Sequence, residues 1–173
     1  VADRGPSSET CGLLGRIHKD LWAEAEGSKA AAGHLDDAIA AYRQGFEADW
    51  RDAYPGINAL TLLDIRGTDA DLESKDELLP VVRYSVKRRL ATQPDYWDYA
   101  TLLELAVLSW NQEEAFAHTA DALAVVREVW EPETTLRNLK LIEGARTERG
   151  EPTDWLEQIE QALEAKMAEM AAG

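Results

Sequence analysis

The sequence predicts an all-α fold, a solenoid of helical hairpins with about eight helices. Three observations support this class. The 173 residues are 45% hydrophobic and 29% charged, with only six prolines, a composition typical of helices packed on helices. Apolar residues recur at three- and four-residue spacing in the segments between glycines and prolines. One segment is repeated at an offset of 40 residues, a period typical of solenoids.

Four amphipathic helices are expected in the first half of the chain. They cover residues 8–25, 35–48, 54–65 and 74–90. In the first helix the aliphatic residues between Leu13 and Leu21 follow the helical period. An alanine- and glycine-containing link joins it to the second helix, which begins at Leu35, so the two form a hairpin. Pro55 opens the third helix, where its missing N–H is harmless, and Gly67 closes it.

The boundary before the fourth helix depends on one acidic stretch and one proline. Residues 68–73 are acidic and are expected to form a loop. Ser74 and Glu77 have the spacing of a capping box. Because Pro80 removes a backbone hydrogen bond from a helix that starts at Ser74, we expect a kink there or a later start.

Four further helices are expected in the second half. They cover residues 96–110, 111–130, 132 to shortly before Gly150, and 154–170. Asn111 is a suitable N-cap, with Glu114 three residues later. Residues 1–7 are expected to be disordered or a linker, and 8–173 to be a single helical repeat domain. Since Val1 is not a natural start, the chain is expected to be a fragment of a longer protein.

The internal repeat makes a tetratricopeptide-like solenoid the expected fold. Residues 58–65 (NALTLLDI) are similar to residues 98–105 (DYATLLEL). Four residues have the spacing of the second helix of a tetratricopeptide repeat: Ala38, Tyr42, Gly45 and Phe46. Gly15 supplies the small residue at which the two helices of such a hairpin touch. The period is slightly longer than the roughly 34 residues of that repeat.

Charge and cysteine content exclude several classes of function. The net charge of −15 repels phosphate backbones and anionic membranes, so we expect no nucleic-acid binding and no membrane binding. No apolar run approaches the ~20 residues of a membrane span. Cys11 is the only cysteine, so there is no internal disulfide and no thiolate metal cluster. A reducing, cytoplasmic location fits this composition.

Catalytic and metal-binding constellations are not expected. His18, His34 and His118 lie on different helices or links without an HExxH-type pair, and each is interpreted as a surface or packing residue. The glycines of residues 12–15 lie inside a helix without the lysine-serine ending of a phosphate loop. The glutamates that follow Asn111 complement a helix dipole. The chain is therefore expected not to be an enzyme, and to hold no cofactor and no metal.

Polar and aromatic residues at helical spacing on the first helices of the hairpins are expected to line a groove inside the superhelix. The candidate groove residues are Arg16, Lys19, Tyr54, Asn58, Thr61, Trp97, Thr101 and Glu104. We expect Arg16 to face the groove and Trp97 to be partly buried. The alternative is that Tyr54 and Trp97 are core wedges, that Asn58 and the threonines bond the backbone, and that the charges are solvated. Glu104 stands where a carboxylate clamp needs a cation, so that clamp is not expected.

A basic cluster in the fourth predicted helix is the candidate anion site. It comprises Arg83, Lys87 and Arg88, followed by Arg89. Arg83 and Lys87 share a helix face at a spacing of four. One interpretation is a solvated face that balances Asp76 and Glu77. The other is a site for a phosphate-bearing ligand or an acidic partner segment, which arginine would hold through two hydrogen bonds.

Three strings together carry a family resemblance. They are residues 11–22 (CGLLGRIHKDLW), 54–58 (YPGIN) and 95–98 (DYWD). Over about residues 9–125 the chain resembles the TRAFs-binding domain, the divergent tetratricopeptide region of the apoptosis signal-regulating kinases and of related bacterial proteins. His18 stands where a kinase member has tyrosine, a change that leaves the helix intact.

The resemblance implies a regulatory module that binds an adaptor protein or a ligand. The bacterial members look like sensor or scaffold parts of signalling and defence proteins, and no kinase or other effector signature is present here. Because the sequence looks bacterial, binding of eukaryotic TRAF proteins is not carried over. We expect a scaffold module that binds a protein segment or a fused domain. The alternative is a sensor that binds a small nucleotide-derived signal in its groove, a reading that depends on family analogy and on the cluster at Arg83.

Overall fold

The computed structural model describes residues 5–172, and this part of the chain contains eight α-helices and no strand. The helices are α1 (Ser8–Glu24), α2 (Lys29–Ala48), α3 (Ala53–Arg66), α4 (Asp69–Leu90), α5 (Tyr96–Leu108), α6 (Gln112–Val125), α7 (Trp130–Glu148) and α8 (Leu156–Ala172). The all-α class and the number of helices are confirmed. The linker predicted at residues 1–7 falls partly on residues 1–4, which lie outside the described residues; Ser7 is the N-cap of α1. Within residues 5–172, no helix combines the length and the apolarity that crossing a bilayer requires.

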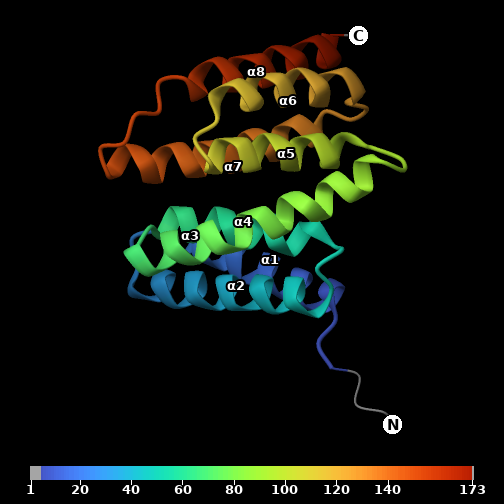
Figure 1. Ribbon diagram of the computed structural model, residues 1–173. Coiled ribbons are helices and arrows are strands. Elements are labelled where there is room, and N and C mark those ends of the chain that lie inside the picture. Colours follow the sequence, from blue (N-terminus) through green and yellow to red (C-terminus); the bar gives the residue numbers. More distant parts are fainter. Residues whose placement is uncertain (1–4, 173) are drawn as a thin grey trace. The chain divides into compact units, whose positions relative to one another are not determined.

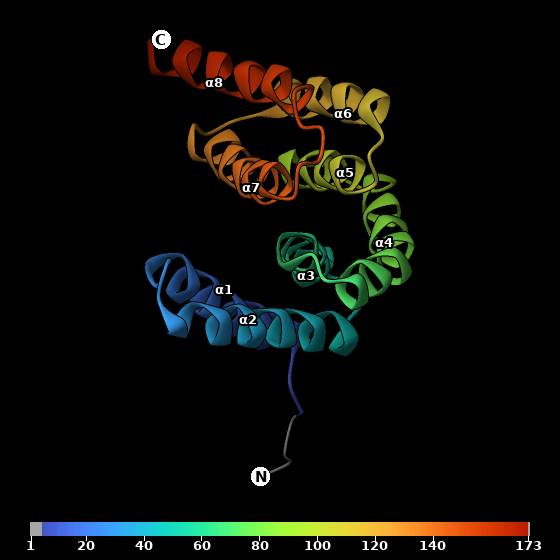
Figure 2. The same ribbon diagram turned by 90° about the vertical axis from the view of Figure 1, so that its left-hand side faces the viewer.

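The chain forms two compact units, Val1–Ser85 and Val86–Gly173, and the boundary between them falls within α4. In unit 1, α1 and α2 form a hairpin, and α3 packs against both (Figure 1). In unit 2, α5 pairs with α6 and α7 pairs with α8. Here α5 lies beside α7 and α6 lies beside α8, so that corresponding helices of successive hairpins are neighbours (Figure 2). This is the arrangement expected of tandem helical repeats.

The core of unit 1 is built on the predicted tetratricopeptide positions of α2. The buried core residues are Leu35, Ala38, Ile39, Tyr42, Ala59, Leu62 and Leu63. Phe46 is also buried, and the α-carbon of Gly56 lies so close to it that a Cβ there would meet the Phe46 ring at 2.8 Å. Between α3 and α4, the buried Lys75 Nζ donates to Asp64 Oδ1 at 2.8 Å. The α2 positions that resemble a tetratricopeptide second helix are therefore residues that pack in the core of unit 1.

Two helices of unit 1 begin earlier than predicted. α2 begins at Lys29 rather than at Leu35, because the intervening alanines favour helix. α4 begins at Asp69, so the predicted loop over residues 68–73 is wrong. Thr68 Oγ1 accepts from the Asp71 N–H and the Thr68 N–H donates to Asp71 Oδ2, each at 3.2 Å. This reciprocal capping starts the helix before Ser74.

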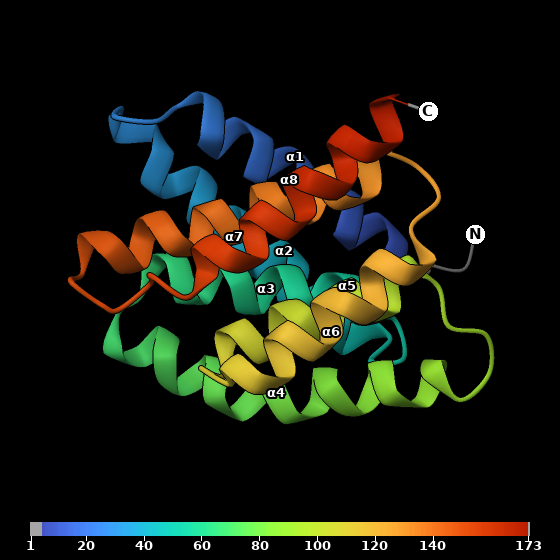
Figure 3. The ribbon, with the colours of Figure 1, turned by 90° about the horizontal axis from the view of Figure 1, so that it is seen from above.

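Pro80 lies inside α4 and does not delay its start. Figure 3 shows α4 as one uninterrupted helix. The expected later start is therefore wrong, and Ser74 and Glu77, which were assigned to a capping box, are interior positions of the helix. A proline costs a helix one backbone hydrogen bond, and the helix continues through that loss.

In unit 2 the predicted N-cap of the sixth helix is confirmed, and the predicted end of the same helix is wrong. Asn111 Oδ1 accepts from the Glu114 N–H at 3.1 Å, as the spacing predicted. The sixth helix ends at Val125 and not near Trp130. The Glu131 carboxylate accepts the N–H of Arg127 at 2.8 Å and that of Glu128 at 3.1 Å. These two bonds stabilise the turn that precedes α7, because the Glu131 side chain reaches back and accepts two backbone N–H groups ahead of the helix.

A fully buried arginine organises the inside of unit 2. Arg146 on α7 donates from Nη1 to the Val107 carbonyl oxygen at 3.0 Å. Its guanidinium lies 3.9 Å from the centroid of the Trp110 ring, a cation–π contact. Trp110 has a left-handed backbone, with φ at 58°. The Trp110 ring and the Glu151 carboxylate, whose Oε2 lies 3.9 Å from Arg146 Nε, together offset the cost of burying this cation.

Candidate interaction surfaces

The first half of α1 faces α2 through small residues. The fully buried positions of the helix are Cys11, Gly12 and Gly15, and Trp22, nearer its end, is partly buried and packs against the core of unit 1. A Cβ built at Gly15 would stand 2.7 Å from two carbons of the Tyr42 ring, and one built at Gly45 would stand 3.0 Å from the Cβ of Cys11. The backbones of α1 and α2 therefore approach too closely for large side chains between them.

As a consequence, the aliphatic residues of α1 face outward. Four residues form this α1 aliphatic stripe: Leu13, Leu14, Ile17 and Leu21. Their spacing of three and four places them on one side of the helix, and their exposed fractions range from 37% to 60%. The helical period predicted the helix correctly, but sequence reasoning did not identify this side as a site. A contiguous exposed apolar patch is typical of an interaction surface.

Three predicted groove residues meet between α1 and α3. Lys19 Nζ donates to Asn58 Oδ1 at 3.1 Å, and Asn58 Nδ2 donates to the Tyr54 carbonyl oxygen at 3.0 Å. The Tyr54 ring covers Gly12 and meets the Tyr42 ring edge-on, with centroids 6.0 Å apart. Tyr54 is 47% exposed, so the alternative of a core wedge does not describe it.

The other two groove candidates of unit 1 differ from each other. Arg16 is exposed on α1. Burial and then Tyr54 raise the pKa of the Tyr42 hydroxyl, while the charge of Arg16 acts in the opposite direction. Thr61 is buried, and its Oγ1 has no hydrogen-bond partner among the described residues. Arg16 is therefore accessible and Thr61 is not, and the groove-facing role of Arg16 stays a prediction.

The remaining groove candidates belong to unit 2. Trp97 is partly buried, as expected, and its ring centroid lies 5.5 Å from that of Trp130. The Thr101 hydroxyl donates to the Trp97 carbonyl oxygen at 2.7 Å. Glu104 is only 6% exposed and accepts from Asn138 Nδ2 at 3.2 Å. Of these three residues, Trp97 keeps part of its indole exposed, whereas Glu104 is buried and hydrogen-bonded to Asn138 within unit 2.

The basic cluster of α4 is partly structural. Lys87 and Arg88 are exposed and Arg83 is partly buried. Arg89 Nε donates to Asp98 Oδ1 at 2.8 Å, and Asp98 belongs to the capping box of α5. The last turn of a helix is also where cations interact favourably with its dipole. These contacts give Arg89 a structural role. For Arg83, Lys87 and Arg88, both the face that balances Asp76 and Glu77 and the anion site stay predictions.

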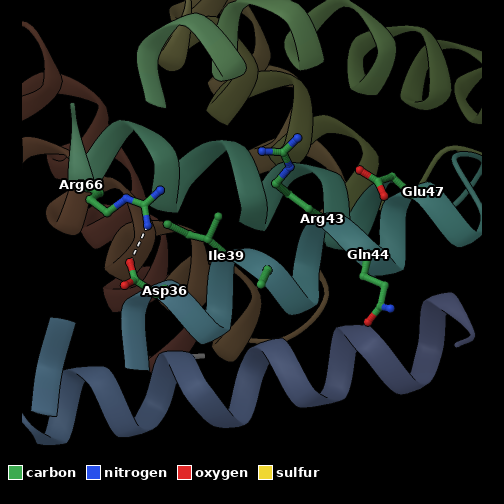
Figure 4. A pocket seen from close by; sticks show the side chains of 7 residues that line it. Asp36, Ile39, Arg43, Gln44, Glu47 and Arg66 are labelled. Carbon is green, nitrogen blue, oxygen red and sulfur yellow. Dashed lines mark hydrogen bonds and ion pairs between the residues drawn. The ribbon is translucent and has the colours of Figure 1, made fainter. Parts of the chain in front are cut away.

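A shallow depression of about 580 Å³ runs along α2 and was not anticipated from the sequence. Figure 4 shows the side chains of Arg43 and Glu47 on its wall, with Arg66 paired to Asp36 at one end. Arg66 also pairs with Asp71, and this guanidinium lowers the pKa of the Asp71 carboxyl to about 2. Because opposite charges already pair at its edge, the depression favours no particular ligand charge.

The hairpin of α1 and α2 brings together two histidines that were expected to stay apart. The ring centroids of His18 and His34 lie 6.2 Å apart. Asp37, one turn after His34, completes a group whose ligand-type atoms lie within 4.8 Å of one another. His18 and His34 are nearly equidistant from the α1–α2 turn at Gly27, and this symmetry is the sequence signal that predicts their meeting.

Comparisons with known proteins show the family of the chain. Residues 1–162 match the family described as the MAP3K TRAFs-binding domain, a longer match than the predicted 9–125. The chain is also similar to the mitogen-activated protein kinase kinase kinase nsy-1 of Caenorhabditis elegans, with 32% identity over 142 residues. That alignment covers 80% of this chain and 9% of the kinase. The chain belongs to the MAP3K TRAFs-binding domain family.

Proposed function

We propose that the chain is a non-catalytic interaction module of a signalling protein, and that it binds a protein segment or a fused domain through the α1 aliphatic stripe. The observation that carries this proposal is the exposure of Leu13, Leu14, Ile17 and Leu21 on a single helix. The family is named for binding other proteins, and a scaffold needs an accessible surface of this kind.

The helix that carries the stripe is held rigidly by its neighbour, which favours binding. Because Gly15 fixes the distance between α1 and α2, the helix that carries the stripe is held in place before a partner arrives. Preorganisation of this kind lowers the entropic cost of association. Burial of a leucine side chain contributes about 1.5–3 kcal/mol, so a few such residues at the centre of an interface are enough to dominate its affinity.

The chemistry of the stripe indicates the kind of partner. An amphipathic helix lays its apolar side chains along such a surface at helical spacing. Polar groups border the stripe, with Arg16 and Asp20 on the same helix, and they provide the rim that interfaces usually have. Two sources of the helix are considered: a TRAF-type protein, as the family name suggests, and a segment of a longer polypeptide that carries this domain.

Several finer statements belong to the same proposal. The absence of catalysis is supported by a family that is named for binding. A cytoplasmic location is supported by the single cysteine and by the similarity to a kinase. The comparisons describe a protein-binding domain and give no support to a nucleotide-derived ligand.

The test is a calorimetric titration of the purified chain with each of the two partner sources. We expect at least one to bind, and the double variant Leu13→Ser/Ile17→Ser to weaken that binding at least tenfold. Val81→Ser/Tyr84→Ser is the matched control, because Val81 and Tyr84 are similarly exposed apolar residues on α4. It should change the affinity less than twofold. Binding that is equally strong in the Leu13/Ile17 variant, or no binding to either source, would contradict the proposal.

A further inference from the structure

We propose that His18, His34 and Asp37 form a binding site for a divalent transition-metal ion, for which Zn²⁺ is the best fit. His18 lies on α1, and His34 and Asp37 lie one turn apart on α2. Two imidazoles and one carboxylate are a common ligand set for zinc, with the fourth position left open to water. This site is independent of the α1 aliphatic stripe and of the proposed protein binding.

The geometry of the three side chains supports metal binding. One ligand atom from each residue lies within 4.8 Å of the others. Tetrahedral zinc with bonds of about 2 Å needs its ligands roughly 3.3 Å apart. His34 is partly exposed and the Asp37 side chain is 64% exposed, so both are free to rotate through the remaining distance. The helices themselves do not need to move.

The nitrogen of one ligand lacks a hydrogen bond in the folded chain. His18 Nδ1 is buried, and no hydrogen-bond partner is present for it among the described residues. The nearest carboxylate oxygen, Oδ2 of Asp37, lies 3.7 Å away, beyond hydrogen-bonding distance. A buried polar atom without a partner is costly. A metal ion bound between the imidazoles and the carboxylate would give His18 Nδ1 the partner that it lacks.

The two helices that supply the ligands are already fixed in register. Gly15, one turn before His18, packs against Tyr42 of α2, and the short link at residues 25–28 closes the hairpin. The ligands are therefore brought together by folding, and an ion bound to them stabilises the folded chain by mass action. This gives the proposal a readout that does not depend on any activity.

The experiment uses the whole chain, freed of any purification tag and treated with a chelator. Isothermal titration with Zn²⁺ should show one ion bound per chain, and Co²⁺ should give the visible absorption of tetrahedral coordination. Zn²⁺ should also raise the melting temperature. His34→Gln should weaken Zn²⁺ binding at least tenfold, as should His18→Gln, while Asp37→Asn weakens it less. His34 is partly exposed, so His34→Gln keeps the test valid even if a change at His18 disturbs folding.

The matched control is His118→Gln. His118 Nδ1 lies 3.4 Å from Asp121 Oδ2 on α6, which is a histidine–aspartate pair without a second histidine. This variant should bind Zn²⁺ as the unaltered chain does. Binding that survives His34→Gln unchanged, binding that is lost with His118→Gln, or the absence of any bound ion would each overturn the proposal.

Discussion

Gly15 of α1 lies directly against the ring of Tyr42 in α2, so closely that a Cβ at position 15 would stand 2.7 Å from two ring carbons. This contact places the side of α1 that carries Gly15 against α2. Trp22 packs against the core from the same helix, while the leucine and isoleucine side chains of α1 lie exposed on another side. The close packing of the hairpin and the exposed stripe are therefore two consequences of one sequence feature.

The glycine contact predicts opposite effects of one substitution at two positions. Gly15→Ala should destabilise the chain by about 1–3 kcal/mol, because overpacking forces the tyrosine to move. Gly33→Ala, on α2 with no atom near its Cβ, should stabilise it by about 0.5–1 kcal/mol through helix propensity. Chemical denaturation of both variants measures the difference. Equal effects at the two positions would refute the contact.

Glu160 on α8 predicts a pH-dependent stability. Burial, and then the negative charge of Glu143, raise the pKa of Glu160 to about 7. The folded chain therefore holds a proton that the unfolded chain releases near its ordinary pKa, so this residue costs stability as pH rises through the window between the two. Glu160→Gln should stabilise the chain by about 1–2 kcal/mol at pH 8, after allowance for partial solvent access.

The gain from Glu160→Gln should disappear toward pH 4, where the glutamate is protonated in both states. Thermal melts across this range measure it. Glu157→Gln, one turn earlier and exposed, is the control and should change stability by less than about 0.5 kcal/mol. If Glu160→Gln is no more stable than the unaltered chain at pH 8, the raised pKa of the Glu160 carboxyl is contradicted.

The pair of Asp64 and Lys75 predicts a large cost for removing one partner. Both side chains are buried, at 1% and 6% exposure. Lys75→Met should cost about 3 kcal/mol, since breaking a buried pair leaves a charge without its partner. The double change Asp64→Leu/Lys75→Met should recover part of the loss. Urea denaturation of the three variants tests this, and a double variant less stable than Lys75→Met would count against it.

A change at Trp97 distinguishes between two candidate binding surfaces. One is the groove that the sequence predicts, and the other is the α1 aliphatic stripe that we propose. Its ring is partly buried against Tyr96 and Trp130, so Trp97→Ala should cost about 1–3 kcal/mol, less than a fully buried tryptophan. Partner affinity should stay within twofold, because Trp97 is not one of the four residues of the α1 aliphatic stripe. A binding assay of the folded variant decides the matter: a tenfold loss would favour the groove.

The elements that the sequence predicted best are those with strong local signals. The third helix, between Pro55 and Gly67, is placed to within one residue at each end, because proline and glycine act through the backbone alone. The start of α4 differs from the prediction because the reciprocal bonds of Thr68 and Asp71 begin the helix well ahead of Pro80. The end of α6 differs because Glu131, a residue outside this helix, caps the turn that follows it.

The candidate sites were harder to predict than the helices. Helical periodicity shows that α1 has an aliphatic side, but it does not show that this side is turned outward. That outcome depends on the close approach at Gly15. The meeting of His18 and His34 depends on the register of the hairpin. Their similar separation from Gly27 indicates this register only when α2 begins at Lys29 rather than at the predicted Leu35.

The most direct test of the central claim is a methyl-detected NMR titration of the chain with its binding partner. We predict that the shifts concentrate in the methyl groups of Leu13, Leu14, Ile17 and Leu21. The methyl groups of Leu102 and Leu103 on α5 should stay unchanged. If the shifts appear on α5 or on the basic part of α4 while the four α1 residues remain unaffected, the α1 aliphatic stripe is not the binding surface.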